Sequence, residues 1–107
     1  MDLILELQAK TKQLEKAVAE LRINGTELAK AERDYKVLLR QECLKLRDEG
    51  MAIGMIDKVC YGIPSVAEAR FKRDVAQTTY DANQDFINSI KLQLRLIESQ
   101  IQRDYEV

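Results

Sequence analysis

The stretch GMAIGMIDKVCYGIPSVAEAR, residues 50–70, separates two long helical patterns and holds three of the chain's four glycines and its only proline. Gly50 follows a helical pattern and supplies the residue type that often ends a helix in a left-handed conformation. Apolar residues then recur at helical spacing, which predicts a short helix over 52–61. Residues 50–64 are therefore expected to form a bend, or tip, between two longer helices.

The second long helix is expected over 65–105. Pro64 favours an extended residue before it, and Ser65 followed three residues later by Glu68 has the pattern of a capping box. Apolar residues repeat every seven positions in this segment, which is typical of a coiled-coil stripe. The repeating positions are Tyr80, Ile87, Leu94 and Ile101, with Asn83, Ile90 and Ile97 three residues after the first three.

The first long helix is expected over 3–49. Its apolar stripe has alternating spacings of three and four and consists of Ile4, Leu7, Thr11, Leu14, Val18, Leu21 and Leu28. Asn24 and Gly25 interrupt this region, and Asn24 with Glu27 could cap a new helix. Because the stripe keeps its phase across the interruption, one continuous or gently kinked helix is favoured. A break there would instead give a three-helix bundle.

These patterns predict an all-α protein with a single domain over 1–107. The expected architecture is a long antiparallel helical hairpin, coiled-coil-like, with one short helix at its tip. Phe86, Leu92 and Leu96 widen the apolar face of the last helix beyond what one antiparallel helix can cover. A homodimer is therefore expected to bury the surplus apolar surface.

The composition excludes several classes of protein. The chain has 107 residues, 33% of them charged, and a formal net charge of -1, so no global field attracts it to nucleic acid or to a membrane. No apolar run is long enough to span a bilayer, and the start lacks a secretory pattern. A soluble cytoplasmic protein is expected, in which Cys43 and Cys60 are buried, reduced thiols rather than a disulfide.

The residues of the main catalytic templates are missing. The chain has no histidine, no phosphate-binding loop and no cysteine or carboxylate cluster with metal-ligand spacing. A nucleophile paired with histidine is therefore impossible. A non-enzyme is expected, with no catalytic residue, cofactor, metal or small-molecule substrate.

Three kinds of non-enzymatic function remain. The first is a surface at the tip that binds a protein partner, formed by Met51, Ile53, Met55, Ile56, Tyr61 and Ile63. The second is a nucleic-acid-binding module with a helix-turn-helix-like tip, which would use Arg33, Lys36, Arg40, Arg47, Arg70, Lys72 and Arg73. The third is a structural coiled-coil spacer.

Several short elements between Ala31 and Ile101 carry a family resemblance. They are AERDYK (31–36), LRDEGM (46–51), YG before the proline, RFKRDVA (70–76), residues 83–87 and KLQLRLIESQI (91–101). The segment resembles small helical proteins of unknown function from the early regions of temperate phages and prophages of Gram-positive bacteria. The resemblance implies the cytoplasm of a bacterial host, a phage or host protein as partner, and an accessory role in DNA recombination, replication or host takeover. It implies no catalytic residue.

Overall fold

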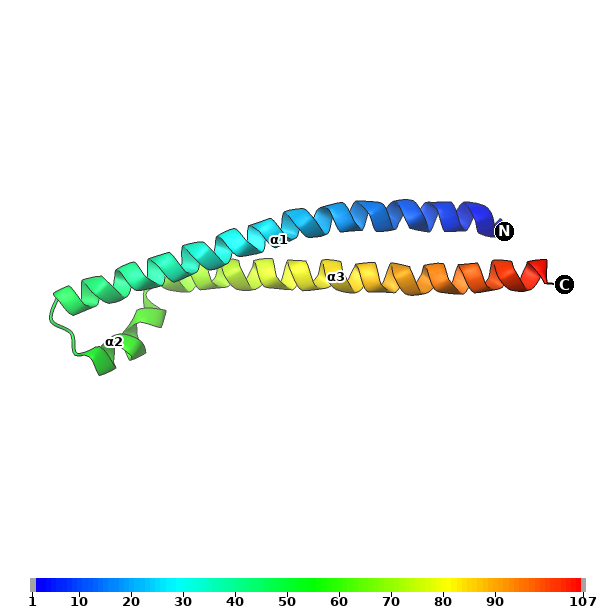
Figure 1. Ribbon diagram of the computed structural model, residues 1–107. Helices are drawn as coiled ribbons and strands as arrows, with labels where there is room; N and C mark the ends of the chain where they lie inside the picture. The colour runs from blue at the N-terminus through cyan, green and yellow to red at the C-terminus, as the bar shows by residue number, and fades with distance from the viewer. Residues whose placement is uncertain (1, 107) are drawn as a thin grey trace. The chain divides into compact units, whose positions relative to one another are not determined.

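The computed structural model describes residues 2–106 and contains three α-helices and one 3-10 helix (Figure 1). The elements are α1 (Leu3–Asp48), α2 (Ile53–Val59), the 3-10 helix η1 (Cys60–Gly62) and α3 (Pro64–Tyr105). No strand occurs within residues 2–106. The prediction of an all-α protein is therefore confirmed.

Helix α1 begins with a side-chain cap and runs for 46 residues. Asp2 Oδ1 accepts hydrogen bonds from the backbone N–H of Ile4 at 2.9 Å and of Leu5 at 3.4 Å, so it satisfies donors that the first turn leaves free. The helix continues through Asn24 and Gly25. The break that would have produced a three-helix bundle is absent.

A Schellman motif ends α1. The backbone N–H of Gly50 donates to the Arg47 oxygen, and the N–H of Met51 donates to the Leu46 oxygen, both at 3.0 Å. Gly50 has φ +91°, a left-handed conformation that glycine adopts without a Cβ penalty. The helix stops at Asp48, one residue before the predicted end at position 49.

The tip and the start of α3 differ in detail from the sequence-based expectation. The predicted helix over 52–61 is a shorter α2 followed by η1, which closes with a hydrogen bond from the Ile63 N–H to the Cys60 oxygen at 3.3 Å. Helix α3 starts at Pro64, so Ser65 lies inside the helix and is not its cap. The first helical position suits proline because its missing N–H would have no partner there anyway.

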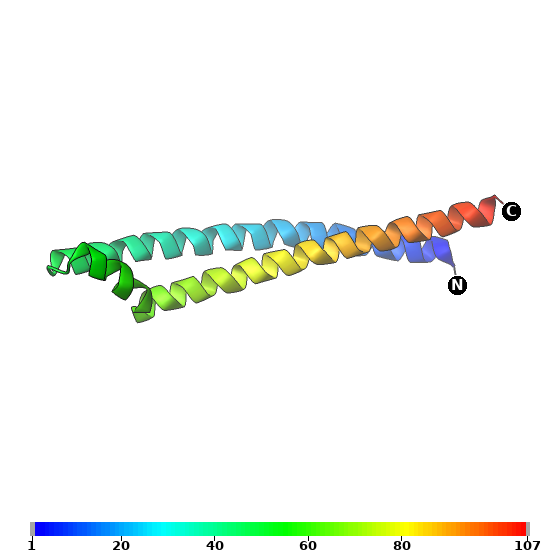
Figure 2. The same ribbon diagram turned by 90° about the horizontal axis from the view of Figure 1, so that it is seen from below.

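The contacts divide the chain into two compact units. One combines the residues up to Asn24 with those from Tyr80 onward, and the other is Gly25–Thr79. Figure 2 shows both helical segments of each unit from a second direction. Each unit pairs a stretch of α1 with a stretch of α3, and the second unit also contains α2 and η1.

In the unit that contains both chain ends, the paired stretches of α1 and α3 run in opposite directions. Asn83 ties them together: its Nδ2 donates to the Ala17 oxygen at 3.1 Å, and its Oδ1 accepts from Asn24 Nδ2 at 2.8 Å. Ala17 is buried, and its small side chain lets α3 approach closely. The buried α3 residues of this unit are Ile87, Ile90 and Ile97.

The predicted apolar stripe of α1 is correct at its leucines and wrong at the residues between them. Leu7, Leu14 and Leu21 are half-buried as expected, but Ile4 and Val18 are 44% and 46% exposed. Thr11 is exposed as well. Ala17, one residue before Val18, faces α3 instead: it is buried, and its backbone oxygen accepts the hydrogen bond from Asn83 Nδ2.

The unit formed by Gly25–Thr79 has a more polar helix pairing. Tyr35 of α1 is buried, and the guanidinium of Arg73 from α3 lies 4.7 Å from the centre of its ring. The fully apolar core of this unit lies at the tip, where Ile56, Cys60 and Val66 are 7%, 1% and 0% exposed. The contact between α1 and α3 buries few apolar side chains in this unit. The tip segment therefore supplies most of its apolar core.

Replacement of Asn83 by alanine should destabilise the protein. The variant loses two hydrogen bonds and leaves the amide of Asn24 without its Asn83 partner, which costs about 1–2 kcal/mol. Asn88→Ala is the matched control, because Asn88 is exposed on the same helix and gains the same helix propensity. Urea unfolding measures both free energies of unfolding, and equal values for the two variants would contradict the role of Asn83.

Alanine should have opposite effects at two glycines of the tip. Gly50→Ala forces a side chain into a left-handed conformation and should lower the free energy of unfolding by about 1 kcal/mol. Gly54→Ala lies within α2 with open space around a new Cβ, and should raise it by up to about 1 kcal/mol. Thermal unfolding of the pair, followed by circular dichroism, checks the signs.

Candidate functional site

The apolar residues of the tip divide into exposed and buried sets. Ile53 is 75% exposed, Met55 50% and Tyr61 47%. Met51 and Ile63 are half-buried. The tip therefore offers a substantial apolar surface built from α2 and η1.

Ile56 does not belong to that surface. It was predicted to contact a partner, but it is only 7% exposed and packs in the tip core. The reason is its position on α2: a helix this short has one side that faces the rest of the unit, and Ile56 lies on that side. Ile56 therefore offers a partner little surface.

A groove runs between α1 and the tip segment α2–η1. It consists of two adjoining hollows of about 320 and 280 Å³ that share Arg40, Cys43 and Asp57. We name it the α1–α2 groove. Its other lining residues are Lys36, Leu39, Cys60 and Tyr61 in the first hollow and Leu44, Arg47, Ile53 and Ile56 in the second.

Two exposed apolar residues of this region are not among those predicted from the sequence to contact a partner. Leu44 is 42% exposed in the groove, and Val59 is 37% exposed on α2 beside Met55 in helical spacing. Leu44 stands four residues after Arg40 and three before Arg47. That spacing places the three on one side of a helix, so the sequence contained the signal for Leu44.

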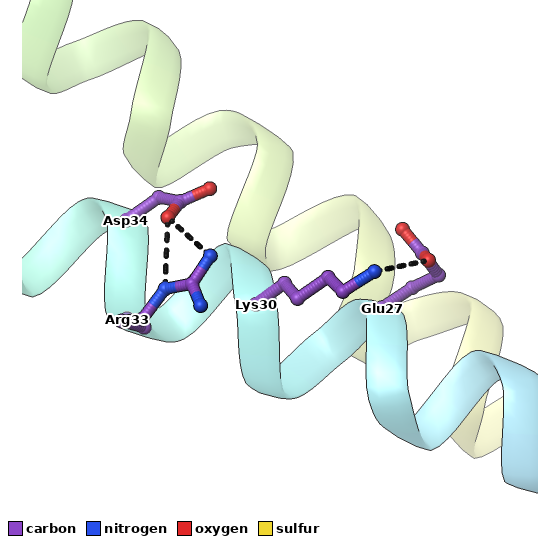
Figure 3. Close-up of polar contacts among 4 residues, drawn as sticks. All are labelled: Glu27, Lys30, Arg33 and Asp34. Carbon is purple, nitrogen blue, oxygen red and sulfur yellow. Dashed lines mark hydrogen bonds and ion pairs between the residues drawn. The ribbon is translucent and has the colours of Figure 1, made fainter.

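The seven basic residues predicted for nucleic acid do not form one patch. Lys36, Arg40 and Arg47 line the α1–α2 groove. Arg33 instead binds the carboxylate of its neighbour Asp34, with its Nη2 3.1 Å from Oδ1 (Figure 3). Of the four predicted residues on α1, Arg33 therefore forms an ion pair with its neighbour, and the other three line the groove.

The basic residues of α3 are also dispersed. Arg73 bonds Asp74 at 2.8 Å; this hydrogen bond raises the pKa of the guanidinium, which stays charged. Arg70 lies 5.8 Å from the centre of the Tyr61 ring. Lys72 lines a different groove, between α1 and α3, together with acidic residues such as Glu68.

That second groove has a mixed charge. Its acidic residues are Glu27, Asp34 and Glu68, and its basic residues are Lys30 and Lys72. Lys30 forms an ion pair with Glu27 at 3.7 Å (Figure 3). A phosphate backbone would meet more carboxylates than cations here, so this groove does not extend the basic surface.

Cys43 and Cys60, 17 positions apart in sequence, meet across the α1–α2 groove. Both are free thiols; Cys60 is buried and Cys43 is half-buried. Burial and the neighbouring Cys60 thiol raise the pKa of the Cys43 thiol above its ordinary value. The Cys60 thiol also contacts the Asp57 oxygen at 3.9 Å. Cys43 is therefore a weakly reactive thiol at neutral pH.

Within residues 2–106, no three cysteine or carboxylate side chains gather in a way that could hold a metal ion. None of the helices in the described part of the chain has an apolar stretch sufficient to cross a membrane. Comparison with known protein families, curated proteins and solved structures finds no match to this chain. The proposed function is therefore inferred from the exposed and charged residues on the surface of the molecule.

The Cys60→Ala variant should make Cys43 more reactive. The substitution removes the neighbouring thiol that raises the pKa of Cys43, so the pKa falls and more thiolate is present at a given pH. Alkylation by iodoacetamide, measured from pH 7 to 10, should show a midpoint that moves to lower pH. A faster rate with an unchanged midpoint would mean that the substitution only opened access to Cys43.

Proposed function

We propose that this protein is a non-enzymatic interaction protein that presents the apolar surface of its tip to a protein partner. The observation that carries the proposal is the exposure of four large apolar side chains within nine consecutive residues: Ile53, Met55, Val59 and Tyr61. Several large apolar side chains exposed to water in one short segment are typical of an interaction site.

The proposal includes a helical hairpin with coiled-coil-like pairing. In both long helices the buried and half-buried positions follow alternating spacings of three and four residues, as coiled-coil packing requires. On α1 the series includes positions 14, 17, 21, 24 and 28, and on α3 it includes positions 83, 87, 90, 94 and 97. Asn24 and Asn83 occupy this series and fix the register of the pair.

The proposal also includes a homodimer. The chain exposes 8005 Å², whereas a compact monomer of 12.3 kDa exposes about 6,100 Å². Phe86, Leu92 and Leu96 are 52%, 57% and 61% exposed, as expected if a single intramolecular helix cannot cover them. A second copy that covers these side chains would bury apolar surface that a single intramolecular helix leaves exposed.

The biological context rests on the family resemblance. It favours a phage or prophage protein that acts on a phage or host partner in the bacterial cytoplasm, in DNA recombination, replication or host takeover. No catalytic group, cofactor or substrate forms part of this proposal. The helices position a surface, and the function follows from what that surface binds.

Nucleic-acid binding is the second candidate, favoured by one specific observation. Lys36, Arg40 and Arg47 lie in a single groove, and none of them forms an ion pair within residues 2–106. The apolar residues of the same groove weigh against it, because Leu44 and Ile53 gain little from a phosphate backbone. The protein partner therefore remains the leading proposal.

The partner should depend on Met55. Tagged protein captures partners from a lysate of a Gram-positive host with and without nuclease, and mass spectrometry identifies them. Met55→Glu should lose a nuclease-resistant partner at least about tenfold, because burying a carboxylate in an apolar contact is costly. Its helicity by circular dichroism should be unchanged, since Met55 is half exposed.

Val37→Glu is the control, because Val37 is 51% exposed on α1 and does not belong to the tip. It should retain the partner. Capture that disappears with nuclease would support the nucleic-acid alternative. Strong self-association without any captured partner would support a structural spacer.

A further inference from the structure

The α1–α2 groove has a regular row of cations along one edge. Lys36, Arg40 and Arg47 are separated by four and seven residues on α1, which corresponds to about 6 and 10 Å along a helix. The one carboxylate that lines the groove is Asp57. Three positive charges thus face a single negative charge, in a protein whose net charge is -1.

Apolar side chains occupy the space beside this row. Leu44, between Arg40 and Arg47, is 42% exposed, and Ile53 across the groove is 75% exposed. Tyr61 lines the same hollow as Lys36. An occupant therefore meets apolar surface along the middle and positive charge along the edge.

This combination discriminates between classes of ligand. A phosphate backbone would neutralise the cations but would leave Leu44 and Ile53 without apolar contacts. An amphipathic helix offers an apolar stripe and a charged edge at the same repeat as α1 itself. Charge complementarity then requires that the edge of the occupant be acidic.

We propose that the α1–α2 groove binds an acidic amphipathic helix of a protein partner. A helix antiparallel to α1 would carry three Asp or Glu residues separated by seven and then four positions, with leucine or isoleucine between them. The inference rests on the proposed function and specifies its partner. The exposed tip residues Met55 and Val59 lie outside the groove lining and are not needed for it.

The test uses a synthetic helical peptide of about 16 residues with glutamates at that spacing and leucines on the adjoining side. A second peptide has lysine in place of each glutamate. Fluorescence anisotropy measures the binding of each labelled peptide to the full chain. The acidic peptide should bind, and the basic peptide should bind at least about tenfold more weakly, because like charges repel across the groove.

Two variants of the protein locate the site. The double variant Arg40→Glu with Arg47→Glu should weaken the acidic peptide at least about tenfold and should strengthen the basic one. Ile53→Ala should weaken the acidic peptide severalfold, because it removes the apolar contact and keeps the charge. The matched control is Lys12→Glu with Lys16→Glu, which makes the same change of charge on exposed α1 residues outside the groove.

Three results would overturn the inference. They are failure of the acidic peptide to bind, equal loss in the control variant, and tighter binding of a 20-base-pair DNA duplex that Arg40→Glu with Arg47→Glu abolishes and Ile53→Ala leaves unchanged. The double variant also separates this inference from the proposed function. If it still captures the nuclease-resistant partner from lysate, the interaction function stands and the groove is not its site.

Discussion

Contact between a stretch of α1 and a stretch of α3 within each unit is the constraint on which the rest of the structure depends. A pair of helices buries only the positions that face each other, and every other apolar side chain stays in contact with water. Leu5, Phe71 and Leu96 are each more than 60% exposed for this reason. The large exposed apolar surface is thus a consequence of the architecture, and it makes an interacting partner or a second copy necessary to the proposal.

The contact between α1 and α3 involves different residue types in the two units. The tip supplies the apolar core that this contact lacks in the second unit. Isoleucines dominate around Asn83, whereas Tyr35 with Arg73 occupies the pairing between Gly25 and Thr79. The second unit gains its apolar core from the tip, through Ile56 and Cys60. The same short segment therefore supplies buried side chains to its unit and forms the wall of the α1–α2 groove, and Ile56 and Cys60 belong to both. Substitution of its exposed lining residues, Ile53 and Tyr61, tests binding apart from stability.

Charge in this protein is local. A net charge of -1 suggests no affinity for charged partners, yet the α1–α2 groove gathers Lys36, Arg40 and Arg47 around one carboxylate. Arg33 and Arg73, by contrast, bind the carboxylates that follow them in sequence. Neighbouring pairs of this kind contribute little to stability at the surface, but they remove cations from the surface available to a ligand. The cations that stay available to a ligand are those of the α1–α2 groove, which lie beside its exposed apolar residues Leu44 and Ile53.

The sequence by itself determined the all-α class, the approximate ends of each helix and the position of the bend, because these depend on local periodicity and on Gly50 and Pro64. It identified the exposed tip residues Ile53, Met55 and Tyr61 by composition alone. Only the tertiary structure decided which of two overlapping stripes of α1 faces α3, since Ile4 and Val18 fit the pattern as well as Ala17 does. It also decided that Ile56 is buried, that Cys43 meets Cys60, and that the basic residues divide among separate sites. Those outcomes depend on contacts between residues far apart in sequence, which periodicity does not encode.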